Sequence, residues 1–354
     1  MYPETFIDGF HDTNAVRGMQ YSILGRTNLK VSKLSIGGST FGNVYGSFSE
    51  DEGADFLKMA LQKGINYIDT GPHYGLGRSE KFLGKALKTV PRNAFYISTK
   101  VCRYETYFDF SANTVRRSFE KSLSLLGLDY VDIVFIHDIE FAPDSKYLLQ
   151  ETIPALLELK AKNKLRFIGA SAYPVSILKD LCELSNDIDV ILSYSRDCLF
   201  DDTLQKLSSF FQSTNIGVIN AACTGMSLLT SVGPCKWHPA SPLLKEICKR
   251  AAEETKASNY YSKSKAVELG RLATYYALQK PYPTCLVGVF SASVLLDNLD
   301  VLLNGISNEE KQLLEDISRR YFPERNHEWE ESNLKAYSQG KESDVNKYKA
   351  YLDR

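Results

Sequence analysis

Four residues that can take part in proton transfer close or follow short apolar runs of this sequence. Asp69, Lys100 and His137 each end such a run, and Tyr74 lies a few residues after Asp69. A free tyrosine titrates at about pH 10, so it needs a nearby cation to lower its pKa before it exchanges protons easily. We expect Lys100 to supply that cation, Asp69 to hold it, and His137 to donate a hydrogen bond to a substrate oxygen. Tyr74 would then be the general acid of a carbonyl reduction, or the base of an alcohol oxidation.

Each of these residues also has a structural interpretation. Asp69 precedes a Thr-Gly-Pro sequence and could cap a helix or start a turn. Tyr74 could be an ordinary loop residue, and His137 a core histidine with its hydrogen bonds satisfied. A lysine that closes an apolar strand is harder to explain, because lysine is rarely buried without a partner. The four together favour a catalytic site over four separate structural roles.

The elements that must position these residues form a repeating pattern. Eight short apolar runs are predicted strands: Leu34–Gly38, Ile65–Asp69, Ala94–Lys100, Val131–His137, Leu165–Ser171, Val190–Tyr194, Ile216–Ala222 and Thr284–Val289. Helical patterns are predicted at Glu50–Lys63, Ser79–Leu87, Asn113–Leu126, Glu151–Lys162, Val175–Leu184, Asp202–Phe211, Pro242–Thr255, Ser264–Leu278 and Ala292–Leu303. This alternation is typical of parallel strands joined by right-handed crossovers.

Eight β/α units predict an α/β fold, a closed (β/α)8 TIM barrel in a single domain. An open doubly wound sheet is the alternative, but no G-x-G-x-x-G follows the first strand. Active sites of such barrels lie at the carboxyl ends of the strands, where the four residues would meet. We expect an N-terminal segment over residues 1–20, the barrel over 21–320 with a long loop at Met226–Ser241, and a polar tail over 321–354.

Composition excludes several classes of protein. The chain has 354 residues, 44% hydrophobic and 24% charged, with a formal net charge of −1. These values are close to those of average globular domains, and they give no electrostatic reason to expect nucleic acid as a partner. We find neither a signal peptide nor an apolar run of about 18–20 residues, so we expect a cytoplasmic protein without a membrane partner. The seven cysteines are widely spaced without C-x-x-C, and we therefore expect no disulfide framework and no metal site.

Three longer motifs surround the four residues. They are NYIDTGPHYGLGRSEKFLGKAL from Asn66, STK at Ser98–Lys100, and LGLDYVDIVFIHD at Leu126–Asp138. These motifs resemble the aldo-keto reductases, and the resemblance extends from about Tyr21 to about Leu303. It implies that Asp69, Tyr74, Lys100 and His137 form a catalytic tetrad, and that the cofactor is a nicotinamide dinucleotide.

Two further segments narrow the resemblance. Leu24–Gly46 and the loop Ser227–Lys249, which contains WHPASP, are similar to the L-galactose dehydrogenase and aldose 1-dehydrogenase subgroup. This similarity implies oxidation of C1 of an L-galactose-like aldose to its lactone by hydride transfer. A small sugar or carbonyl compound is therefore the expected substrate, and a monomer is the family-based default. Tyr45, Tyr104 and Trp237 are the expected pocket residues, with Trp329 of the tail as a further candidate.

The expected cofactor contacts lie on and after the strands. They are Ser39, Thr40, Asp69, Ser171, Ser193, Gly288, Ser291, Asp297 and Asn298. Ser39 and Thr40 could equally be turn residues. No Lys or Arg occurs between Val287 and Leu303, and recognition of a 2′-phosphate favours such cations. We therefore predict a preference for NAD, with NADP as the alternative.

Two other functions fit the same residues. An NADPH-dependent reductase of aldehydes or ketones would use the same tetrad in the opposite direction. A nicotinamide-binding regulatory subunit would keep the site but turn over no sugar, because a fold and its site can be reused. Absorbance of reduced nicotinamide in the presence of aldoses and carbonyls would separate these hypotheses.

Overall fold

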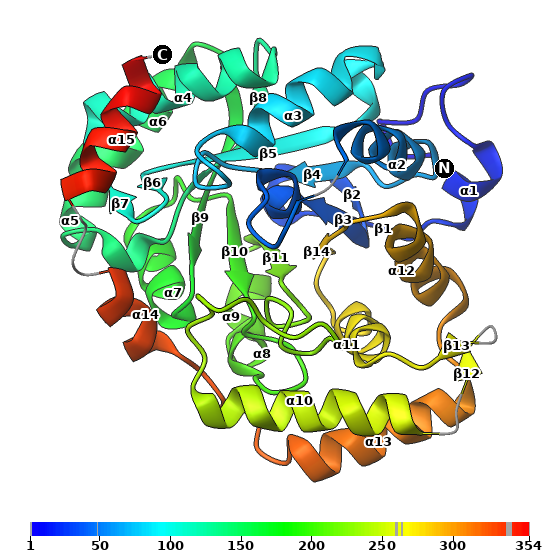
Figure 1. The fold of residues 1–354 in the computed structure, drawn as a ribbon. Helices are drawn as coiled ribbons and strands as arrows, with labels where there is room; N and C mark the ends of the chain where they lie inside the picture. The colour runs from blue at the N-terminus through cyan, green and yellow to red at the C-terminus, as the bar shows by residue number, and fades with distance from the viewer. Residues whose placement is uncertain (1, 48, 259–260, 263–264, 338–341, 354) are drawn as a thin grey trace.

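Eight parallel strands close into a barrel in the computed structural model, which describes residues 2–47, 49–258, 261–262, 265–337 and 342–353 (Figure 1). The strands are β3 (Leu34–Gly37), β4 (Tyr67–Asp69), β5 (Tyr96–Val101), β8 (Val131–Ile136), β9 (Leu165–Ala172), β10 (Val190–Tyr194), β11 (Gly217–Ala221) and β14 (Thr284–Gly288). They follow one another around the barrel in chain order, and β14 pairs with β3 to close it. The predicted (β/α)8 fold and all eight predicted strands are confirmed.

Helices surround the barrel at nearly the predicted places. They are α2 (Glu50–Gln62), α3 (Arg78–Ala86), α4 (Ala112–Leu126), α6 (Ile153–Ala161), α7 (Val175–Leu184), α8 (Thr203–Lys206), α9 (Ser208–Ser213), α10 (Pro242–Ala257), α11 (Leu269–Leu278) and α12 (Ala292–Asn304). Short side-chain caps explain several starts: Ser111, Ser241 and Ser291 each accept a hydrogen bond from the third backbone N–H of the helix that follows.

Three predicted helices were wrong in their bounds. The segment predicted as one helix over Asp202–Phe211 is two short helices, α8 and α9. The helix predicted from Glu151 begins with a single π-helical turn, η6 (Leu148–Thr152), before α6. The helix predicted from Ser264 starts only at Leu269; Ser264 itself lies outside the described residues, and β12 (Tyr261–Ser262) pairs with β13 (Lys265–Ala266) there.

Alternation along the strands separates two apolar layers. Val190 and Leu192 of β10 belong to the cluster inside the barrel, whereas Ile191 packs in the layer between strands and helices. The strands are therefore buried on both faces, as expected for a parallel sheet covered by helices. The hairpin of β1 (Tyr21–Ile23) and β2 (Lys30–Ser32) places Leu24 and Val31 in the inner cluster, so it covers the amino end of the barrel.

The segment expected to be a polar tail packs against the barrel. After α13 (Asn308–Tyr321), it forms α14 (Glu330–Tyr337) and α15 (Glu342–Asp353), and α15 lies beside α4 (Figure 1). Trp329 and Tyr348 are buried, which the charged composition of this segment concealed. A short helix, α1 (Thr13–Gly18), precedes the barrel. Among the described helices, none has the length and apolarity that a bilayer crossing requires.

Candidate active site

Neighbouring strands bring the four predicted catalytic residues to one end of the barrel. Asp69 is the last residue of β4, Lys100 lies near the end of β5, and His137 directly follows β8. These strands are adjacent in the barrel. Tyr74 is in the loop after β4, and all four residues line the same cavity. Their carboxyl-end position is the one at which TIM-barrel enzymes carry their active sites.

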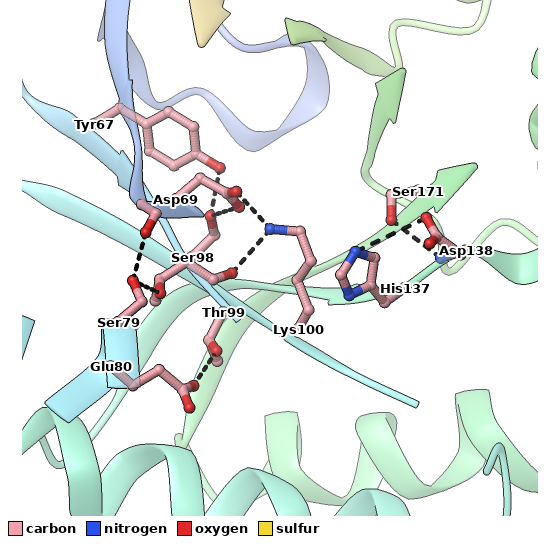
Figure 2. Close-up of polar contacts among 12 residues, drawn as sticks. Tyr67, Asp69, Ser79, Glu80, Ser98, Thr99, Lys100, His137, Asp138 and Ser171 are labelled. Atoms are coloured by element: carbon pink, nitrogen blue, oxygen red, sulfur yellow. Dashed lines mark hydrogen bonds and ion pairs between the residues drawn. The ribbon is translucent and has the colours of Figure 1, made fainter. Parts of the chain in front are cut away.

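The ammonium of Lys100 is held by a buried carboxylate. Its Nζ lies 2.5 Å from Oδ2 of Asp69 and also donates to the backbone carbonyl of Thr70 at 2.8 Å (Figure 2). Oδ1 of Asp69 accepts a hydrogen bond from the hydroxyl of Ser98 at 2.7 Å, so both carboxylate oxygens are occupied. Burial lowers the pKa of Lys100, and the carboxylate of Asp69 opposes that shift.

The pKa of Tyr74 differs from the expectation. The ammonium of Lys100 lies 4.8 Å from the centre of the Tyr74 ring, yet the pKa of the phenol is well above its usual value. Burial is the main cause, and the charges of Asp69 and Asp138 add to it. The charge of Arg103 opposes this rise, and an effect of Lys100 on the pKa of Tyr74 stays a prediction. Tyr74 is therefore a protonated hydrogen-bond donor at neutral pH.

His137 is a neutral imidazole beside Tyr74. The two rings are edge to face with centroids 6.0 Å apart. Burial lowers the pKa of His137 far below its usual value, and the charges of Lys100 and Arg103 add to this effect. A neutral ring can donate one hydrogen bond and accept another. Its Nδ1 is buried and has no hydrogen-bond partner among the residues that the structure describes.

A close backbone contact fixes the loop that carries Tyr74. Gly42, in the 3-10 turn η2 (Gly38–Gly42), packs on this loop, and a Cβ at Gly42 would lie 2.5 Å from the carbonyl oxygen of Tyr74. A side chain at this position would push the two loops apart. The backbone N–H of Tyr74 bonds to the carbonyl of Gly71, which completes the turn.

The cavity above the tetrad has a volume of about 190 Å³. Six more of the residues expected from the sequence line it: Ser39, Thr40, Tyr45, Ser171, Trp237 and Gly288. The rings of Tyr45 and Trp237 lie 5.6 Å apart, and Tyr45 also meets Phe290 edge to face. Trp329 of the tail lines the cavity as well.

Two expected site residues face away from the cavity. Ser193 is fully buried beside Ile191 on the outer face of β10, since successive side chains of a strand point to opposite sides. Tyr104 is buried in the hairpin of β6 (Arg103–Tyr104) and β7 (Tyr107–Phe108), where its ring stacks on Tyr348 at 4.0 Å. Neither lines the cavity, so the contact of Ser193 with a cofactor and that of Tyr104 with a substrate stay predictions.

The remaining expected cofactor residues lie on α12 and before it. Ser291 caps this helix and accepts a hydrogen bond from the N–H of Val294. Asp297 and Asn298 are in its second turn, outside the cavity. Their contact with the adenosine end of a cofactor stays a prediction.

Several cavity residues were missed at the sequence level. Arg103 and Asp138 form a buried ion pair in the wall, and His73, Tyr194 and Asn333 also line it. Charged residues beside buried strand ends, as in the His-Asp pair after β8, are the signal that could have indicated the ion pair. Asn333 had no such signal, because its position depends on how the C-terminal segment packs.

The polar groups beside the tetrad fit a nicotinamide dinucleotide. Thr40 Oγ1 is buried in the cavity wall without a hydrogen-bond partner in the described part of the chain, and a bound amide or phosphate could supply one. Gly288 keeps the wall open, because a Cβ there would meet Thr40 Cγ2 at 3.0 Å. Ser39 and Ser171 add hydroxyl groups to the same wall.

A closed parallel barrel with an Asp–Lys–Tyr–His cluster at its carboxyl end is the architecture of a nicotinamide-dependent oxidoreductase. Residues 33–319 match the model of the aldo/keto reductase family. The chain therefore belongs to the aldo/keto reductase family and is an oxidoreductase. Members of this family use nicotinamide cofactors.

Its relatives include sugar dehydrogenases. The chain is 40% identical to L-galactose dehydrogenase of Arabidopsis thaliana, over 86% of this chain and 95% of the relative. It is 32% identical to D-arabinose 1-dehydrogenase of Saccharomyces cerevisiae, over 84% and 93% of the two chains. Among solved structures, the holo form of the aldo-keto reductase AKR11C1 from Bacillus halodurans matches with a TM-score of 0.64 at 24% identity, covering 84% of this chain and 96% of that one. The last match supports the fold alone.

Proposed function

We propose that this protein is an aldose 1-dehydrogenase that oxidises C1 of an L-galactose-like sugar to the lactone, with NAD as the preferred cofactor. The observation that carries the proposal is the placement of Tyr74, Lys100, Asp69 and His137 around one cavity that is also lined by hydroxyl groups and aromatic rings. The similarity to sugar dehydrogenases over most of the chain supports the choice of substrate class.

The chain's own residues handle the proton of the C1 hydroxyl. His137 donates a hydrogen bond to the substrate oxygen from its neutral ring, which orients that oxygen toward Tyr74. Tyr74 accepts the hydroxyl proton in its phenolate form, which the charge of Lys100 stabilises before the transfer, and it becomes the neutral phenol. Asp69 keeps Lys100 charged and in position through their 2.5 Å contact.

The nicotinamide ring supplies the hydride acceptor and, when oxidised, a positive charge that favours the phenolate. Ser39, Thr40, Ser171 and Gly288 are the residues that would hold the cofactor, with α12 at its adenosine end. Since α12 carries no Lys or Arg, a 2′-phosphate would lack a cationic partner there, which supports NAD over NADP.

The test is direct. Reduced nicotinamide is followed by absorbance with NAD or NADP and a panel containing L-galactose, D-arabinose, other aldoses and simple alcohols. We expect aldose-dependent reduction of NAD, with a lower kcat/KM for NADP. Turnover of simple alcohols alone, or a strong preference for NADP, would contradict the proposal.

Carbonyl reduction is the second candidate. The raised pKa of Tyr74 keeps the phenol protonated at neutral pH, and a general acid is what reduction requires. Oxidation of the reduced cofactor by aldehydes and ketones measures this activity in the same assay. A kcat/KM for carbonyls above that for every aldose would favour it.

A further inference from the structure

The cavity wall contains a buried ion pair that has no part in the proposed proton transfer. Arg103 donates from its guanidinium to Oδ2 of Asp138, and both residues line the cavity. Asp138 is fully buried, and Arg103 nearly so. Because a buried carboxylate needs a paired cation, Arg103 accounts for the charge of Asp138 but leaves its second oxygen to be explained.

That second oxygen lies next to the imidazole of His137. Oδ1 of Asp138 is 3.8 Å from Nε2 of His137 (Figure 2). It accepts no hydrogen bond from any residue in the described ranges. An unpaired buried carboxylate oxygen is costly, so a donor from a bound molecule is the expected partner.

The backbone of Asp138 supports a functional reason for this arrangement. Its φ is +50°, in the left-handed region that residues with a Cβ adopt rarely. Such strained residues persist where the surrounding structure holds them, and they gather at ligand-binding and active sites. The turn that carries Asp138 directly follows the His137 strand, which places the carboxylate one residue from the proposed substrate-orienting group.

We propose that Asp138 is a specificity-determining residue that accepts a hydrogen bond from the hydroxyl on the carbon next to the reacting carbon, the C2 hydroxyl of an aldose. Arg103 holds the carboxylate in position. The proposal rests on the proposed oxidation at C1, because it assumes that His137 orients the C1 oxygen. Oxygens on adjacent sugar carbons are close enough for one to meet His137 while its neighbour meets Asp138.

A site built to bind a hydroxyl rejects an analogue that lacks it, because the buried acceptor is then left unpaired. The enzyme should therefore discriminate against 2-deoxy sugars. We expect the wild-type kcat/KM for its best aldose to exceed that for the 2-deoxy analogue by roughly 10- to 100-fold. The 3-deoxy analogue should show a smaller loss.

The decisive experiment combines this substrate series with variants of Asp138. In Asp138→Ala the ratio of kcat/KM between the aldose and its 2-deoxy analogue should fall to nearly one, and Asp138→Asn, which retains a carbonyl acceptor, should be intermediate. The ratio is taken within one preparation, so it does not depend on the fraction of folded enzyme.

Asp132 provides the matched control. It is a buried aspartate on the same strand, β8, and pairs with Arg92 and Arg166 at 2.8 Å each. Asp132→Ala should destabilise the fold and leave the 2-deoxy ratio at the wild-type value. An unchanged ratio in Asp138→Ala overturns the role of Asp138 while aldose oxidation stands. Absence of oxidation of every aldose overturns the proposed function, and this inference with it.

Discussion

Tyr74 combines a buried phenol with a neighbouring ammonium, and the proton-transfer proposal depends on its hydroxyl. Tyr74→Phe removes that hydroxyl and keeps the ring against Lys100, so the cavity should retain its shape. We expect kcat for aldose oxidation to fall by about 10²- to 10⁴-fold, with the Kd for NAD within about twofold of wild type. Steady-state kinetics and a fluorescence titration of NAD measure the two quantities. Turnover close to the wild-type level would show that another group moves the proton.

The raised pKa of Tyr74 gives the pH dependence a definite sign. Oxidation uses the phenolate, which is the minor form below a pKa that lies above the usual value of about 10. The rate of oxidation should therefore rise with pH between about pH 6 and about pH 9, by up to tenfold per unit. His137 adds no inflection in this range, because its pKa is far below its usual value and the ring stays neutral.

Carbonyl reduction uses the protonated phenol, so its rate should stay nearly flat over the same range. Profiles of kcat/KM in both directions, recorded in one buffer series, test the assignment. An oxidation rate that falls as the pH rises from neutral would contradict a tyrosine base.

At the residue scale, the sequence predicted the site residues that lie at the ends of strands. It missed the ion pair that joins residues of two separate elements. Asp69, Lys100 and His137 follow from their places at strand ends, because parallel strands of a barrel bring those ends together. Ser193 lies on the outer face of β10, because a step of one residue along a strand reverses the face that a side chain occupies. Asp138 was missed because its role depends on an ion pair with Arg103. Arg103 belongs to the separate hairpin of β6 and β7.

At the scale of elements, α12 is the proposed determinant of cofactor choice. Val294 is exposed in the first turn of this helix, six residues after Gly288 in the chain. Val294→Arg adds a cation at that end, and we expect it to raise the kcat/KM ratio of NADP to NAD by roughly tenfold or more. Leu303→Arg adds the same charge at the exposed far end of α12 and should leave the ratio unchanged. Equal shifts in both variants would indicate a general charge effect.

Trp329 connects α14 to the cavity. Its ring stacks on Tyr173 at 4.8 Å and meets His238 edge to face at 5.0 Å, and it is 2% exposed. Trp329→Ala should lower the free energy of unfolding by about 3–5 kcal/mol and raise the KM for the aldose, because the ring also forms part of the cavity wall. Urea unfolding and steady-state kinetics measure these effects. Leu334→Ala, an exposed position on the same helix, should change neither quantity.

At the scale of the whole molecule, the pattern of eight β/α units predicted the barrel. It did not predict that the C-terminal helices α14 and α15 pack against it. The strands and helices follow from local periodicity, which a sequence carries residue by residue. The packing of α14 and α15 depends on a few aromatic residues within a polar segment, and their partners lie about two hundred residues earlier in the chain. Tyr348 stacks on Tyr104, and Trp329 on Tyr173. Composition alone cannot show such pairings, because burial here is decided by matching surfaces.

The contacts of α15 make it part of the folded unit rather than an appendage. Tyr348 is 3% exposed between Tyr104 and Tyr107, and Lys347 pairs with Glu105 at 2.5 Å. A chain that ends at Tyr337 would uncover the hairpin of β6 and β7, whose Arg103 lines the cavity. We expect this truncation to lower the urea midpoint of the whole protein, and Tyr348→Ala alone to cost about 3 kcal/mol of unfolding free energy.

The expected cofactor contacts lie on other elements, so the Kd for NAD should stay within about twofold of wild type in the truncated chain. The exposed Lys349 on the same helix supplies the control, and Lys349→Ala should leave the urea midpoint unchanged. A truncated chain with the wild-type midpoint would show that α15 adds no stability. Loss of NAD binding in a truncated chain that remains folded would instead place part of the cofactor site on the C-terminal segment.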